Sequence, residues 1–83
     1  LAATETDVVL QLYKQHCAEC HGENRLGGMG PALLPEKLKR LKQQTAQEVI
    51  RHGRVATQMP GFTEKLSPQD TALLAAYIYT PLP

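Results

Sequence analysis

Three residues able to bind a metal or a cofactor lie within five positions of one another. Cys17, Cys20 and His21 form a Cys-x-x-Cys-His segment, and the chain has no other cysteine. Such a segment can be a disulfide, half of a zinc site, a thiol redox centre or a point of covalent haem attachment. The rest of the sequence must decide among these four chemistries.

The first three alternatives each lack something. A disulfide between Cys17 and Cys20 would close a four-residue loop, which by chain entropy stabilises a fold by at most about 2 kcal/mol. A structural zinc site needs four ligands and would have to recruit His16 or His52. A thioredoxin-like centre follows a strand, and no strand pattern precedes this one. A helical turn at 17–21, however, would project all three side chains to one side, where one haem plane could meet them.

Length and composition agree with a buried cofactor. The chain has 83 residues, no Trp, one Phe and three Tyr. We expect a single domain over 1–83, and a domain this short buries only about 60% of its unfolded surface. A porphyrin would supply the missing core volume. The net charge of +1 gives no reason to expect nucleic acid, and no apolar run approaches the roughly 18 residues of a membrane span.

The N-terminal segment is expected to be a helix that leads into the cysteine motif. Thr4 and Asp7 have the spacing of an N-terminal cap. Val8 and Leu12 are four residues apart and are predicted to stack beside Val9, Tyr13 and His16 in one apolar stripe. This helix would place the start of the motif.

Breaker-rich loops separate the later helices. Residues 22–35 hold four Gly and two Pro and are expected to form an irregular loop that can wrap a cofactor. A short helix is predicted within 35–44. A longer one is predicted from Thr45, which has the capping-box spacing to Glu48, as far as Gly53.

The C-terminal helix has the strongest signals, and a second loop precedes it. Ser67 is a favoured N-cap, Pro68 a favoured first helical residue and Asp70 an acid at the third position. The helix is predicted over 68–79. The sequence thus predicts an all-α fold of four to five short helices.

With these elements in order, the chain resembles the class I c-type cytochromes over nearly its whole length. The matching segments are the N-terminal helix with Tyr13, "CAECHG", "GPAL" at 30–33, "MPGF" at 59–62 and "AAYIY" in the last helix. The resemblance implies the compact cytochrome c fold, with its helices wrapped around one covalent haem c and with the N- and C-terminal helices crossing near Tyr13 and Tyr77. The segments "GGMGPALLP" and "QMPGF" also look like those of the small cytochromes that accompany the nitrite reductases of denitrification and the maturation of their special haem.

The resemblance also implies roles for individual residues. Cys17 and Cys20 match the thioether anchors, His21 the proximal iron ligand and Met59 the distal one. The carbonyl oxygen of Pro31 matches the group that accepts a hydrogen bond from the proximal imidazole.

Other residues near these motifs have more open interpretations. Arg54, Arg51 and Gln58 flank the Met59 loop and are candidate partners of the haem propionates. Met29 is either a packing residue or a rival ligand. His16 is expected to be a surface or helix-packing residue that points away from the haem. Phe62 is expected to anchor the Met59 loop in the core.

The expected function is electron transfer. Haem iron with His and Met ligands has no vacant position for a substrate, so it moves one electron without a reaction of its own. The alternative is a haem sensor or catalyst whose distal ligand is labile.

Partner and location follow as further expectations. Residues 36–54 hold six basic and two acidic side chains, so we expect a redox partner with an acidic docking patch. Covalent haem attachment implies a periplasmic protein whose leader has been removed. A monomer is expected, with a dimer at high concentration formed by exchange of the C-terminal helix about a hinge at 54–61.

Overall fold

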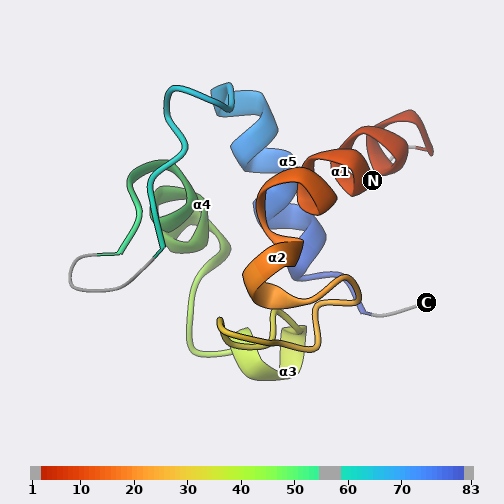
Figure 1. Ribbon diagram of the computed structural model, residues 1–83, viewed down its shortest axis with the longest axis vertical. Coiled ribbons are helices and arrows are strands. Elements are labelled where there is room, and N and C mark those ends of the chain that lie inside the picture. The colour runs from red at the N-terminus through yellow and green to blue at the C-terminus, as the bar shows by residue number, and fades with distance from the viewer. Residues whose placement is uncertain (1–2, 55–58, 82–83) are drawn as a thin grey trace.

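The protein is all-helical in the computed structural model, which describes residues 3–54 and 59–81 (Figure 1). Its helices in chain order are α1 Ala3–His16, α2 Ala18–His21, α3 Pro35–Leu38, α4 Gln43–His52 and α5 Pro68–Ile78. These two ranges contain no strand. The prediction of four to five short helices is confirmed. Within the same ranges, no helix combines the length and the apolar run needed to cross a membrane.

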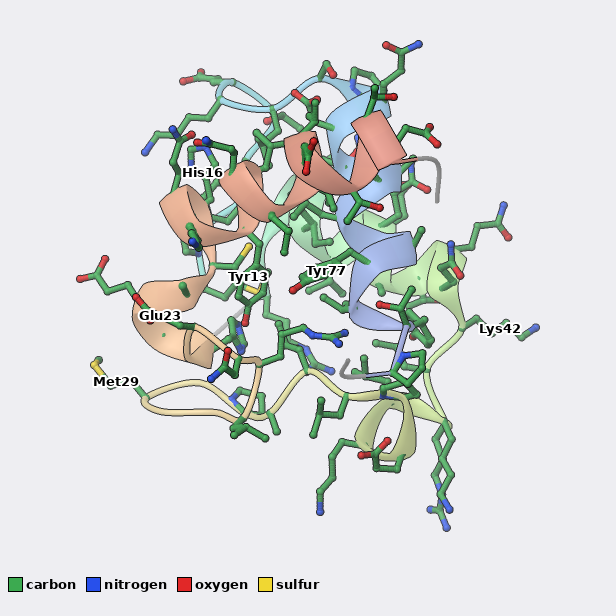
Figure 2. The ribbon with its side chains drawn as sticks, turned by 90° about the vertical axis from the view of Figure 1, so that its right-hand side faces the viewer. Tyr13, His16, Glu23, Met29, Lys42 and Tyr77 are labelled. Atoms are coloured by element: carbon green, nitrogen blue, oxygen red, sulfur yellow. The ribbon has the colours of Figure 1, made fainter. Side chains whose placement is uncertain are left out.

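Helices α1 and α5 cross where two tyrosines meet. The rings of Tyr13 and Tyr77 lie edge to face with their centroids 5.4 Å apart, and Figure 2 shows them side by side. Ala75 on α5 is fully buried, and its small side chain lets two helices approach closely. The expected crossing near Tyr13 and Tyr77 is confirmed.

The buried face of α1 is narrower than the predicted stripe. Val9 and Tyr13, which belong to that stripe, are 0% and 1% exposed, whereas Val8 is 48% exposed. Neighbouring residues are about 100° apart around a helix, so Val8 turns toward solvent where Val9 is buried. The prediction that Thr4 caps the helix is also wrong, because α1 already includes Ala3.

Helix α5 begins as the sequence predicted. The Ser67 hydroxyl accepts a hydrogen bond from the Asp70 N–H at 3.0 Å, and the Asp70 carboxylate accepts one from the Ser67 N–H at 3.2 Å. Pro68 occupies the first turn. This reciprocal cap satisfies two backbone donors that the helix itself leaves unpaired.

Helix α4 ends as predicted but begins two residues early. It starts at Gln43, and Lys42 at its N-cap makes no side-chain cap. The expected start at Thr45 is therefore wrong, because glutamine is a good helix former and extends the helix before it. The end is at Gly53, whose φ of 77° is open to glycine at little cost.

Two long segments connect these helices. Residues 22–34 form an irregular segment from α2 to α3, which is a single turn with Pro35 at its start and is shorter than the predicted 35–44. Between α4 and α5, the described residues 53–54 and 59–67 are also irregular. The predicted hinge at 54–61 lies partly on 55–58, outside the described residues.

The hydrophobic core draws on α1, α4, α5 and the segment before α5. Its buried members are Val9, Tyr13, Ala46, Ile50, Phe62, Leu66, Leu74, Ala75 and Ile78. Several of them, including Ile50, Phe62 and Leu74, also line a large cavity. The core therefore forms part of the cavity wall.

Candidate functional site

The Cys-x-x-Cys-His segment is one helical turn that continues from α1. The backbone N–H of Cys17 donates to the Tyr13 carbonyl at 2.9 Å, and the N–H of His21 donates to the Cys17 carbonyl at 2.9 Å. The predicted turn is thus present, and Cys17, Cys20 and His21 all line the cavity. Helix α1, packed on α5 through Tyr13, sets where the motif begins.

The two cysteines are not bonded to each other, and both are half-buried. Burial raises the pKa of the Cys17 thiol to about 11. Reactive redox thiols have lowered pKa values, so this site does not favour the thioredoxin-like chemistry. The described residues also form no cluster of three or more metal-binding side chains of the His, Cys, Asp and Glu types, so the zinc alternative has no support there.

The His21 ring is held in one orientation by the loop at 22–34. Its Nδ1 lies 2.7 Å from the carbonyl oxygen of Pro31. A Cβ at Gly30 would lie 2.8 Å from Cε1 and 2.9 Å from Nδ1 of the same ring, so only glycine lets the loop pass this closely. Nδ1–H donates to the carbonyl, and Nε2 keeps its lone pair for a ligand bond.

The segment around Met59 is fixed against the end of α4. The N–H of Phe62 donates to the carbonyls of Ile50 and Arg51, and the Phe62 side chain is 7% exposed. A Cβ on Gly53 would come within 2.8 Å of the Met59 carbonyl oxygen. Met59 is half-buried and lines the cavity. The expected anchoring of this loop by Phe62 is confirmed.

The cavity measures about 890 Å³ and brings the two parts of the site together. That volume lies near the upper end of the roughly 300–1,000 Å³ typical of small-molecule and cofactor sites. Apolar side chains on its walls are Leu33, Leu38, Leu41, Ala46, Val49, Ile50, Phe62, Leu74 and Ile78. A large, mainly apolar space with Cys17, Cys20, His21 and Met59 on its walls fits a haem.

Basic side chains reach the same cavity. Arg54 lines it, as predicted for a propionate partner, and so do Lys37 and Arg40 around α3. Arg51 instead lies 3.4 Å from Glu48 on its own helix. Gln58, the remaining predicted candidate, lies outside the described residues. Sequence reasoning missed Lys37 and Arg40, because nothing local shows that α3 covers the cavity.

Two other residues singled out from the sequence, His16 and Met29, differ in where their side chains lie. His16 was expected to point away, but it lines the cavity and packs edge to face on Phe62, with ring centroids 5.6 Å apart. The contact with Phe62 agrees with the expected packing role of His16, whereas its place on the cavity lining does not agree with a side chain that points away from the haem. Met29 is also among the lining residues, but its side chain is 79% exposed and projects away from the helices (Figure 2).

Sequence reasoning also missed a buried arginine in the 22–34 loop. Arg25 is 1% exposed, and its Nη1 donates to the carbonyls of Tyr77 and Thr80 at 2.8 Å each. Close by, the Tyr13 hydroxyl donates to the Gly22 carbonyl at 2.8 Å, and burial raises the pKa of Tyr13 well above its ordinary value. These contacts tie the start of the loop to both α1 and α5.

The helical fold and the cavity next to a Cys-x-x-Cys-His turn define a c-type cytochrome, as the sequence predicted. A sequence profile agrees over residues 5–78; its description is "Cytochrome C oxidase, cbb3-type, subunit III". The chain belongs to this family of c-type cytochromes. As a member, it carries covalently bound haem c.

Three individual proteins illustrate the similarity. A dihydro-heme d1 dehydrogenase of Pseudomonas aeruginosa is 59% identical over 68 residues, which are 82% of this chain and 14% of the relative. Cytochrome c55X of Stutzerimonas stutzeri is 38% identical over 73 residues, which are 88% of this chain and 65% of the relative. The solved structure of the c-type cytochrome NirC has a TM-score of 0.82 at 32% identity, covering 95% of this chain and 93% of that one. The chain thus spans less than two thirds of either relative matched by sequence.

Proposed function

We propose that the protein is a one-electron carrier whose haem c is attached through Cys17 and Cys20 and ligated by His21 and Met59. The observation that carries this proposal is the single cavity lined by all four residues. Bound haem supplies a reversible Fe(III)/Fe(II) couple. With both axial positions filled by protein side chains, no position is left for a substrate.

The chain contributes orientation on both sides of this site. The Pro31 carbonyl fixes the His21 ring through Nδ1 at 2.7 Å, which leaves Nε2 as the coordinating atom. The end of α4 fixes the backbone beside Met59 through the two hydrogen bonds of Phe62. Both ligands would therefore be held in place before the cofactor binds, and the backbone beside them would need little rearrangement.

Basic side chains are proposed to hold the propionates. Arg54 is the residue expected from sequence, and Lys37 and Arg40 join it on the cavity lining. Guanidinium groups pair well with carboxylates, often through two hydrogen bonds. These residues would also limit the access of water to that edge of the cofactor.

A basic surface is proposed as the docking site for an acidic redox partner. Residues 36–54 hold six bases and two acids, a local charge of +4 in a chain whose net charge is +1. Lys37, Lys39, Arg40 and Lys42 are exposed. Complementary charge raises the encounter rate and sets orientation, which is what a short-lived redox complex needs.

The biological setting follows from the relatives. Cytochrome c55X, NirC and a dihydro-heme d1 dehydrogenase are all similar to this chain. We place the protein in the periplasm, where it would pass electrons in denitrification. It would act as a monomer when dilute, and size-exclusion chromatography over a range of concentrations tests for the dimer formed by helix exchange.

A second function deserves testing because one relative is named as an enzyme. Identity to the dihydro-heme d1 dehydrogenase is 59%, against 38% to cytochrome c55X. In this alternative the chain is the electron-accepting part of such a dehydrogenase. Removal of two hydrogens from the substrate yields two electrons and two protons, and this haem would accept the electrons one at a time. Substrate binding would belong to the rest of such a protein, since the match covers only 14% of it.

Carbon monoxide tests the carrier proposal against the alternative of a haem sensor. An electron carrier with both ligands in place should show an unchanged reduced spectrum after carbon monoxide is added. Rapid conversion to a carbon monoxide complex would support a labile distal ligand instead. Reduction of this haem by dihydro-haem d1 when the chain is part of a full-length dehydrogenase, and not when the chain is isolated, would support the dehydrogenase alternative.

A further inference from the structure

Arg25 is a buried cation held by the end of a helix. Its guanidinium donates to the carbonyls of Tyr77 and Thr80, both at 2.8 Å, and its Cζ lies 4.5 Å from the centroid of the Tyr77 ring. Burying a charge is unfavourable unless it is paired or hydrogen-bonded. The Tyr77 carbonyl in the last turn of α5 and the Thr80 carbonyl just beyond the helix meet part of this need, because carbonyls at a helix C-terminus lack partners within the helix and carry the negative end of its dipole. The Arg25 Nε is buried without a hydrogen-bond partner among the described residues.

The backbone of Arg25 closes the loop at 22–34. Its N–H donates to the Gly22 carbonyl at 3.2 Å, and its own carbonyl accepts from the Leu33 N–H at 2.9 Å. Its φ of 63° is in the left-handed region, which is unfavourable for arginine. Such a conformation persists only where surrounding contacts hold it, and the buried side chain provides those contacts.

The His21 acceptor lies inside the segment that Arg25 closes. Pro31, whose carbonyl faces His21 Nδ1 at 2.7 Å, is itself exposed. The position of Pro31 is therefore set by the hydrogen bonds of the loop and not by packing in the core. Two of these bonds flank it: the Gly30 N–H donates to the Cys20 carbonyl at 2.7 Å, and the Leu33 N–H donates to Arg25.

We infer that Arg25 is a positioning residue for the proximal histidine. Its side chain fastens the loop to α5, and its carbonyl holds the far end of the loop, so that the Pro31 carbonyl stays on His21 Nδ1. The role is indirect, because Arg25 does not line the described cavity. This inference rests on the proposed ligation by His21.

Hydrogen exchange at the His21 ring tests this role in the reduced holoprotein. The readout is the exchange rate of the Nδ1 proton, followed by NMR. In Arg25→Met, which loses both carbonyl hydrogen bonds, we expect that rate to rise roughly tenfold or more through local opening of the loop. In Arg25→Lys, which keeps a charged donor for the same carbonyls, the rate should lie between those of Arg25→Met and the wild type.

Thr80→Ala is the matched control. The Thr80 hydroxyl also donates to the Tyr77 carbonyl, at 2.6 Å. Removal of this hydroxyl weakens the same helix end and changes no residue of the loop at 22–34. The His21 exchange rate in Thr80→Ala should stay close to that of the wild type. If Arg25→Met does not accumulate as holoprotein, Arg25→Gln replaces it under the same criterion.

Three results would overturn the inference. They are an unchanged rate in Arg25→Met, an equal rise in Thr80→Ala, and a rate in Arg25→Lys as high as in Arg25→Met. Failure of the underlying ligation proposal looks different: the wild-type His21 ring protons would then lack the ring-current shift that a coordinated imidazole shows beneath a haem.

Discussion

Gly53→Ala should displace the Met59 segment while the protein remains folded. The Cβ of alanine would lie 2.8 Å from both the Met59 carbonyl oxygen and the Gly61 nitrogen, and 2.9 Å from the Pro60 carbonyl carbon. These are backbone atoms, so no side-chain rotation relieves the overlap. Ordinary contact begins at 3.4 Å, and the segment must therefore retreat by about 0.6 Å.

The cost has two parts. Alanine at a φ of 77° and a ψ of −174° lies in a region that is almost restricted to glycine and is strained by about 1–3 kcal/mol. Overpacking typically adds about 1–3 kcal/mol. The sum of about 2–6 kcal/mol is less than the stability of most small domains, so we expect a folded protein with a weakened distal ligand.

Two assays follow the effect of Gly53→Ala. Chemical denaturation should give the loss in unfolding free energy, and the weak sulfur-to-iron absorption near the red end of the oxidised spectrum should fall. Full wild-type absorption in Gly53→Ala, with stability unchanged to within about 0.5 kcal/mol, would refute the reasoning.

Three further predictions concern stability, pH and docking. Ser67→Ala removes the N-cap of α5 and should cost about 1 kcal/mol in denaturation without altering the haem spectrum; a spectral change would contradict the separation of cap and site. Tyr13→Phe should cost about 0.5–1.5 kcal/mol at neutral pH by losing the bond to Gly22. Because burial raises the Tyr13 pKa, the native state keeps that proton longer, so wild-type stability should decline above about pH 10. This decline should be shallower in Tyr13→Phe, and parallel curves would contradict it. Electron-transfer rates with an acidic partner should fall as ionic strength rises, and salt-independent rates would point to an apolar contact.

Features set by residues close in sequence could be predicted. The turn at Cys17–His21 and the start of α5 depend on bonds between residues three or four apart, such as those between Ser67 and Asp70. The end of α4 at Gly53 is likewise local. In these places the chemistry of a few neighbouring residues is enough to determine the backbone.

Features set by distant contacts could not be predicted. Arg25 bonds to residues 52 and 55 positions away, and an arginine in a glycine-rich loop would ordinarily be taken as exposed. Val8 and Val9 both have an apolar residue four positions later, so periodicity alone does not say which pair faces α5. The packing of α1 on α5 makes that choice in favour of Val9.

The identity of the sixth ligand is the most direct test of the account. Both Met59 and Met29 lie on the cavity lining, but Met59 is half-buried, whereas Met29 is 79% exposed and projects from the loop. In Met59→Ala, the sulfur-to-iron absorption of the oxidised protein should disappear, the reduction potential should fall and the reduced iron should bind carbon monoxide. In the matched control Met29→Ala, the absorption should remain at its wild-type strength. Retention of that absorption in Met59→Ala, or its loss in Met29→Ala, would contradict the assignment of Met59.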